Sequence, residues 1–178
     1  MKRAAWLLPA LIPGWAFAHP VDEVVQGAYL TLAKGEVRLE LDLTPGTEVV
    51  GVVLKALDSN GDKAVSEAEG RAYGEQVVKQ STLTLGGKAA AWRLDRVSVP
   101  PYQALMEETA TIKVYAIAQR PDRAGAQTLT YGNSYQPAKS QVIANIFLQP
   151  GGGWKYRVTG QKHTQDGRGL TVNYAVSR

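Results

Sequence analysis

VRLELDL, residues 37–43, is the stretch that decides the fold class, because its side chains alternate strictly between apolar and charged. The four odd-numbered positions are valine or leucine, and the three even-numbered positions are arginine, glutamate and aspartate. A period of two is that of a β-strand with one face in a core and the other in water. We therefore predict a half-buried strand over Val37–Leu43 in a mainly β protein.

Other short apolar runs lie on both sides of this strand and are separated by turn residues such as Gly86-Gly87 and Asp166-Gly167. Gln141–Gln149 is apolar at positions of both parities, so we expect that strand to be covered on both faces. Strands at this spacing predict an antiparallel β-sandwich or a barrel-like sheet, in one domain over residues 19–178. The remaining predicted strands are Ala28–Leu32, Thr82–Leu85, Ala90–Val99, Thr109–Gln119, Gln127–Tyr131, Lys155–Gln161 and Leu170–Val176.

A helix–loop–helix pattern interrupts the strands at about residues 45–80. Val49–Leu57 carries its apolar residues at helical spacing, and Thr44 or Thr47 can cap this helix with Pro45 in its first turn. A second helix is predicted from Ser66 to about Gln80. We therefore read the pair as an insertion between two strands of the β domain.

The segment that joins these helices, DSNGDKAVSEAE at residues 58–69, has the spacing of an EF-hand calcium loop. Calcium prefers six to eight oxygen ligands. The oxygen-bearing residues of this loop have the types and positions that match this preference. Position 6 departs from the pattern, because Lys63 stands where glycine normally adopts a positive φ, at a cost of about 1 kcal/mol. The predicted metal ligands are Asp58, Asn60, Asp62, the Ala64 carbonyl, Ser66 and Glu69.

Two features of the loop limit what it is expected to do. Ser66 and Glu69 also form a capping-box pattern, so an exposed helix–turn–helix with a polar turn and no metal is an alternative. EF-hands usually work in pairs, and the sequence contains no second loop. A lone loop between strands favours a structural calcium site over a sensor, with an affinity of roughly 10⁻⁴–10⁻³ M.

Residues 1–18 have the features of a cleaved signal peptide, with Lys2 and Arg3 before an apolar run that ends at Ala16-Phe17-Ala18. Cleavage at about Ala18 would give a periplasmic or secreted protein, and loss of the two basic residues takes the formal net charge from +4 to +2. No other segment is apolar over the length of a membrane span. The remaining Lys and Arg are scattered, which gives no footprint for nucleic acid.

Cysteine is absent, which excludes disulfides, thiolate metal sites and cysteine nucleophiles. With only two histidines, no hydrolase constellation is recognisable, and we expect a protein that is not an enzyme. One alternative remains open. Cleavage after Ala18 would make His19 the first residue, and its amino group and imidazole, together with His163, could form a copper-binding histidine brace in a carrier or an oxidase. A third possibility is an adhesion or envelope-assembly module.

Residues 58–69 and the flanking helices resemble the EF-hand family, which implies calcium binding by the six ligands named above. More broadly, the chain resembles a group of exported bacterial proteins in Val24-Val25-Gln26, Val37–Leu43, Asn133–Leu148 and Leu170–Tyr174. Such β domains are similar to the outer portion of membrane proteins related to hydrogenase and urease accessory permeases, although no membrane segment is available here for a transport role. The combined expectation is a non-enzymatic calcium-binding protein of the cell envelope with a protein partner there.

Overall fold

The computed structural model describes residues 21–107 and 110–178. The expected signal peptide at 1–18 and His19 therefore lie outside the described residues, as does Thr109, the first residue of one predicted strand. Among the described residues, no helix is long and apolar enough to cross a membrane.

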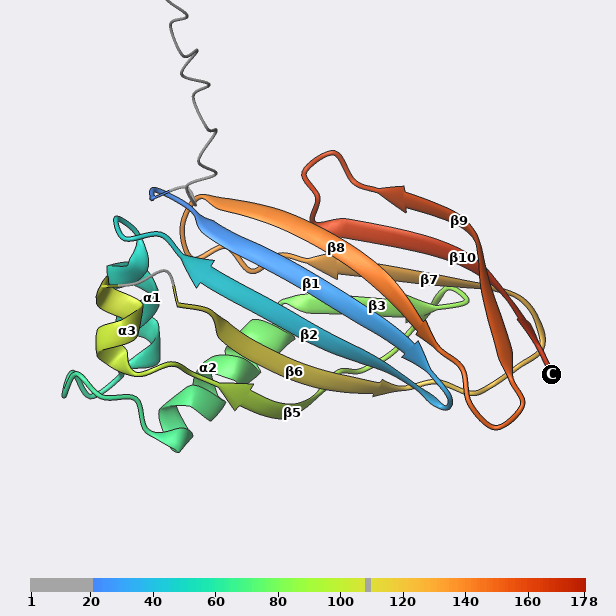
Figure 1. Ribbon diagram of the computed structural model, residues 1–178, viewed down its shortest axis with the longest axis horizontal. Coiled ribbons are helices and arrows are strands. Elements are labelled where there is room, and N and C mark those ends of the chain that lie inside the picture. The colour runs from blue at the N-terminus through green and yellow to red at the C-terminus, as the bar shows by residue number, and fades with distance from the viewer. Residues whose placement is uncertain (1–20, 108–109) are drawn as a thin grey trace, which may run out of the picture.

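The described strands form two five-stranded sheets that face one another (Figure 1). Sheet A has the order β5-β6-β2-β1-β8 and sheet B the order β4-β3-β7-β10-β9. The bounds in sheet A are β1 (Val24–Ala33), β2 (Glu36–Pro45), β5 (Arg93–Ser98), β6 (Ile112–Gln119) and β8 (Ser140–Gln149). Those in sheet B are β3 (Ser81–Leu85), β4 (Lys88–Ala89), β7 (Gly125–Asn133), β9 (Lys155–His163) and β10 (Gly169–Ser177).

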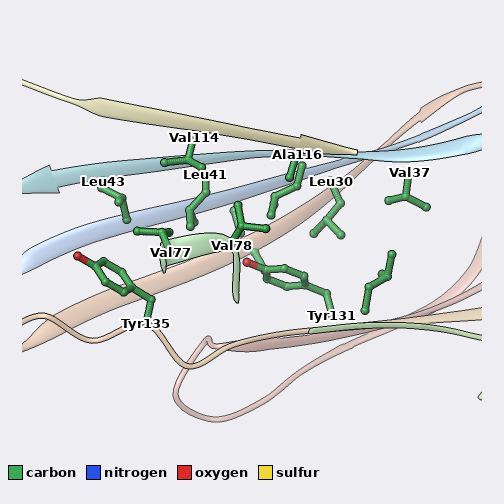
Figure 2. Close-up of a cluster of buried hydrophobic side chains, with 14 of the residues drawn as sticks. Leu30, Val37, Leu41, Leu43, Val77, Val78, Val114, Ala116, Tyr131 and Tyr135 are labelled. Carbon is green, nitrogen blue, oxygen red and sulfur yellow. The ribbon is translucent and has the colours of Figure 1, made fainter. Parts of the chain in front are cut away.

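The predicted alternation over Val37–Leu43 is confirmed in β2, where the four apolar side chains are buried. β2 is the central strand of sheet A and pairs antiparallel with β1 and β6 along its length. Figure 2 shows Leu41 and Leu43 in the cluster that fills the space between the sheets, with Tyr131 of sheet B opposite. The apolar face of β2 is thus the middle of the core.

The mainly β sandwich expected from the sequence is confirmed, and the two separate sheets favour the sandwich over the barrel-like alternative among the described residues. One pairing is not antiparallel: β8 runs parallel to β1, with Ala28 opposite Ala144. The chain reaches β8 from β7 in the other sheet, so a crossover between sheets rather than a hairpin delivers this edge strand.

The expectation that Gln141–Gln149 is covered on both faces is wrong. Val142 and Ala144 are buried, but Ile143 is 52% exposed and Phe147 is 53% exposed. The physical reason is that only the inner face of β8 meets sheet B, and no helix or strand in the described part of the chain packs on its outer face. Phe147 packs against Tyr29 of the neighbouring strand, with ring centroids 6.3 Å apart.

The loop between β9 and β10 covers part of this exposed edge. Gly167 has a φ of 72°, and a Cβ at this position would lie 2.0 Å from the Val142 carbonyl oxygen, so only glycine permits the approach. His163 Nε2 donates a hydrogen bond to the Ala144 carbonyl oxygen at 2.8 Å. Both contacts shield backbone groups of β8 that would otherwise be open to pairing with another strand.

Three helices complete the structure: α1 (Val50–Leu57), α2 (Glu67–Lys79) and α3 (Tyr102–Glu107). The expected cap of the first helix is wrong, because Pro45 ends β2 and Val49 is an N-cap without a side-chain hydrogen bond. α3 was not predicted. It follows Pro100-Pro101, which is consistent with the frequency of proline at the start of helices.

α1 and α2 carry the chain from β2 in sheet A to β3 in sheet B, as expected for an insertion between strands. α1 and α3 lie at one end of the sandwich, and α2 packs along β5 (Figure 1). Tyr73 of α2 and Tyr135, which lies between β7 and β8, place their hydroxyl oxygens 2.7 Å apart in a buried pair. Their rings meet edge to face, with centroids at 6.1 Å.

A buried polar bridge also joins the two sheets. Gln26 of β1 is fully buried, and its Nε2 donates to the Tyr135 carbonyl oxygen at 3.0 Å. Asn133 of β7 donates from Nδ2 to Gln26 Oε1 at 2.9 Å and accepts from the Tyr135 amide at 2.9 Å. Because each polar group finds a partner, the bridge fixes how β7 leaves sheet B without leaving buried groups unsatisfied.

The close packing of α2 on β5 depends on Gly74 and yields a first prediction. A Cβ at Gly74 would lie 2.3 Å from Val97 Cγ2, and valine has little rotameric freedom to move away. We expect Gly74→Ala to lower the free energy of unfolding by about 1–3 kcal/mol, as in other overpacked cores. Urea denaturation followed by circular dichroism measures the change.

Gly51→Ala in α1 is the matched control, since nothing lies within 4 Å of its Cβ position. Alanine has the higher helix propensity, so this variant should be unchanged or stabilised by up to about 1 kcal/mol. Equal effects of the two substitutions would contradict the packing of α2 on β5.

Candidate metal centre

Asp58–Glu69 runs from the end of α1 into the first turn of α2. Asp58 is the C-cap of α1, and its amide donates to the Leu54 carbonyl oxygen at 2.7 Å. Ser66 is the N-cap of α2. Most loop side chains are exposed, whereas Val65 packs against the core, as an apolar residue at this loop position should.

The Asp58 carboxylate organises the first half of the loop. Its Oδ1 accepts from the amides of Gly61 at 2.8 Å and Asp62 at 3.2 Å. Its Oδ2 accepts from the Lys63 amide at 3.0 Å. Three successive backbone donors therefore point at one carboxylate and bend the chain around it.

Asn60 and Asp62 continue the same pattern along the loop. Asn60 Oδ1 accepts from the Asp62 amide at 2.8 Å, and Asp62 Oδ1 accepts from the Ala64 amide at 2.9 Å. Each side chain thus bonds the backbone two residues ahead, as in Asx turns. Asn60 Nδ2 also donates to Asp62 Oδ2 at 3.0 Å.

Glu69 closes the loop from the first turn of α2. Its Oε1 accepts from the Ser59 amide at 2.9 Å and from the Ser59 hydroxyl at 3.0 Å. Its Oε2 accepts from the Ser66 amide at 3.0 Å and hydroxyl at 2.7 Å, and Ser66 Oγ accepts from the Glu69 amide, which completes a capping box. The hydrogen bonds from Ser66 and Ser59 lower the pKa of Glu69 from 4.5 to about 2.

Lys63 adopts the conformation that its loop position predicts, with φ of 62°. It is the one non-glycine residue with positive φ within residues 21–107 and 110–178. Gly61, two residues earlier, has φ of 75°. The loop thus holds a lysine in a left-handed conformation that disfavours residues with a Cβ.

The structure brings the predicted ligands into one short loop but does not gather their carboxylates at one point. No group of three or more His, Asp or Glu side chains in the described part of the chain is placed to hold a metal ion. Asp58, Asp62 and Glu69 instead engage backbone and side-chain donors. The donor set is composed of oxygen, which suits a hard cation such as calcium.

The histidine brace stays a hypothesis, because one of its two histidines lies outside the described residues. His19 lies outside the described residues, and His163 is the last residue of β9. Since the Ala144 carbonyl can only accept, Nε2 of His163 is the donor in this hydrogen bond. His163 therefore has a structural partner on the edge strand of sheet A.

Sequence reasoning missed two contributions to this region. The first is Ser59, whose amide and hydroxyl both donate to Glu69, and no spacing rule distinguishes it from ordinary turn serine. The second is the Tyr73–Tyr135 pair, which ties α2 to the sandwich across a long separation in sequence. No family model and no curated protein matches the chain, so the residues themselves carry the case for this site.

The lowered pKa of Glu69 predicts how stability depends on pH in calcium-free buffer. Because the folded-state pKa is about 2 and the ordinary value is 4.5, ionised Glu69 stabilises the fold above pH 4.5 and loses this effect as the pH falls toward 2. Glu69→Gln should therefore be less stable than the wild type at neutral pH, and the gap should narrow over this window. Urea denaturation at a series of pH values measures it.

Glu67→Gln is the control, because it removes a neighbouring carboxylate that makes none of the Glu69 hydrogen bonds. It should retain the wild-type pH dependence. A gap between the wild type and Glu69→Gln that stays constant down to pH 2 would show that the hydrogen bonds of this carboxylate do not stabilise the fold.

Proposed function

We propose that Asp58–Glu69 binds one calcium ion in an exported, non-enzymatic β protein and that the ion has a structural role. The ligands would be the side chains of Asp58, Asn60, Asp62, Ser66 and Glu69 with the carbonyl oxygen of Ala64. The leader-like residues 1–18 support a periplasmic or secreted location. The calcium-bound unit would then present a surface to an envelope protein partner.

The left-handed Lys63 is the observation that carries this proposal. A plain helix–turn–helix connection has no need to hold a lysine at φ of 62°. An EF-hand loop does need positive φ at position 6, because the chain must turn there around the ion. The three amides that converge on Asp58, including that of Lys63, support the same backbone path.

Calcium binding requires a rearrangement of side chains within this backbone. Glu69 would have to exchange donors on Ser59 and Ser66 for the ion, because both of its oxygens are now occupied by hydrogen bonds. The lost hydrogen bonds offset part of the binding energy. This cost and the charge of Lys63 are consistent with weak binding, which is adequate outside the cytoplasm, where calcium-binding modules work at 10⁻⁴–10⁻³ M.

The packing of the helices supports a structural role rather than that of a sensor. A sensor EF-hand exposes an apolar groove when its helices open. Here Tyr73 and Val77 of α2 and Leu57 of α1 are already buried in the core of the sandwich. Opening would remove them from that core, so calcium is expected to hold the α1–α2 connection in place.

Isothermal titration with calcium tests the proposal directly. The wild type should bind one ion with a Kd of roughly 10⁻⁴–10⁻³ M and melt at a higher temperature, since a hundredfold excess over Kd stabilises by about 2.7 kcal/mol. Asp58→Ala and Glu69→Gln should each abolish the heat and the shift in Tm. Magnesium at the same concentration should give a smaller shift, because it prefers a tighter octahedral site.

Glu67→Gln again provides the control, since it lowers the local negative charge without removing a ligand. It should retain the stoichiometry and lose little affinity. Absence of heat and of any Tm change in millimolar calcium would refute the calcium site and leave the capping-box turn as the better description.

Substitutions of Lys63 separate backbone strain from charge. Lys63→Gly relieves the left-handed conformation and should stabilise the calcium-free protein by up to about 1 kcal/mol, whereas Lys63→Gln keeps the strain and should not. Both remove a positive charge near the ion and should raise calcium affinity by a similar factor of about two to five. Denaturation and calorimetry on the two variants measure these effects, and a loss of stability in Lys63→Gly would contradict the strain.

A further inference from the structure

Four basic side chains that are dispersed in the sequence meet at a cavity between the two sheets, away from the calcium loop. Lys88 lies on β4 and Arg93 on β5, whereas Arg120 and Arg123 lie on the connection from β6 to β7. The β3–β4 hairpin reaches toward the end of the sandwich opposite α1 and α3 (Figure 1). The cavity has a volume of about 660 Å³, which is within the range of small-molecule sites.

The lining of the cavity combines exposed cationic side chains with apolar ones. Leu85, Ala90 and Ile117 contribute apolar surface, and no carboxylate is among the lining residues. Lys88, Arg93 and Arg123 are exposed, and none of them makes an ion pair with any residue whose position is described. Their charges are therefore available to a ligand in the cavity.

Arg120 differs from the other three because it is 4% exposed and held from several sides. It donates to the Ala33 carbonyl oxygen at 3.0 Å, to the Tyr156 hydroxyl at 2.7 Å and to the Asp122 carboxylate. Burial alone would raise the pKa of Asp122, but hydrogen bonds from Tyr156 and the Gly35 backbone, together with Arg120, lower it overall. Asp122 thus remains ionised and balances Arg120.

The Arg120 anchor fixes the β6–β7 connection that carries Arg123. The Arg120 amide also donates to the Gly35 carbonyl oxygen at 2.8 Å, so backbone and side chain together tie this connection to the β1–β2 turn. Arg120 Nε is buried and has no hydrogen-bond partner among the residues that the structure describes. Asp122 balances Arg120, whereas Lys88, Arg93 and Arg123 have no ion-pair partner among the described residues, and a negative ligand group would stabilise this arrangement.

We propose that this cavity binds a small organic anion in which a carboxylate or phosphate group is joined to an apolar body. The anionic group would pair with Arg93, Arg123 and Lys88 at the rim. The apolar body would contact Leu85, Ala90 and Ile117, which line the cavity. A guanidinium suits both anionic groups, because its planar fork of donors matches their paired oxygens.

The concave shape distinguishes this site from a basic surface that would hold a polyanion. A nucleic acid or a charged membrane is met by an extended array of cations on a convex or flat face. Here the cations surround a cavity with apolar walls, and a ligand of limited size can use both features at once.

Calorimetry with octyl phosphate as the probe tests the proposal. Inorganic phosphate, octanol and octylammonium serve as comparisons that supply only the anion, only the apolar chain, or the chain with the opposite charge. Octyl phosphate should bind at least about tenfold more tightly than each of the three, and added salt should weaken it. Equal binding of octanol or octylammonium would overturn the proposal.

Substitutions of lining residues test whether octyl phosphate binds in this cavity. Arg93→Gln/Arg123→Gln, which alters two exposed residues, should weaken octyl phosphate binding by at least about tenfold. Ala91→Trp should block it by filling the cavity without changing charge, since Ala91 is an exposed lining residue. Lys155→Gln/Arg157→Gln on β9, outside the lining, is the charge-matched control and should bind as the wild type does.

Two results would overturn the assignment. One is unchanged binding in both the double variant and Ala91→Trp. The other is the absence of octyl phosphate binding together with co-sedimentation on phosphatidylglycerol vesicles that Arg93→Gln/Arg123→Gln abolishes, which would assign these cations to a membrane surface. Glu69→Gln should leave octyl phosphate binding unchanged, so this site and the calcium loop succeed or fail separately.

Discussion

The apolar face of β2 must be covered along its whole length, because this strand is hydrogen-bonded on both edges and contributes four fully or almost fully buried side chains. Sheet B supplies the cover, with Leu129 and Tyr131 of β7 in the same core cluster. With the two sheets facing one another, the connections from β2 to β3 and from β6 to β7 cross from sheet A to sheet B. Helices α1 and α2 lie on one such crossing, and part of the lining of the cationic cavity lies on another.

The first crossing, from β2 to β3, contains the helix–loop–helix. Gly74 lets α2 approach β5, and the Tyr73–Tyr135 pair ties the same helix to the segment that follows β7. The loop therefore joins one helix that ends near the core to another that is clamped against it. A calcium ion at Asp58–Glu69, as proposed, would restrain the exposed part of this connection, where hydrogen bonds from the loop backbone now satisfy the carboxylates.

The described crossing from β6 to β7 contains no helix and is held in place by hydrogen bonds. Buried Arg120 anchors it through the Ala33 carbonyl, Tyr156 and Asp122, and this leaves Arg123 at the rim of the space between the sheets. A sandwich with twisted sheets separates at its corners. The side chains that line the gap here include small, apolar and basic ones and no carboxylate, so the gap is a cavity with positive charge at its mouth. The proposed calcium loop and the anion site thus use two crossings of the same scaffold.

The sequence by itself determined the features that depend on neighbours within about twelve residues. These were the half-buried strand in β2, the two helices around residues 58–69, the left-handed Lys63 and the mainly β class, because periodicity, turn residues and loop spacing act locally. Only the tertiary structure decided the exposure of Ile143 and Phe147 on edge strand β8, the parallel β1–β8 pairing, the Tyr73–Tyr135 contact and the gathering of Lys88, Arg93, Arg120 and Arg123. Each of these depends on which strand lies at an edge and which connections cross between sheets. That choice is made by the burial of whole faces rather than by any residue's immediate neighbours in the chain.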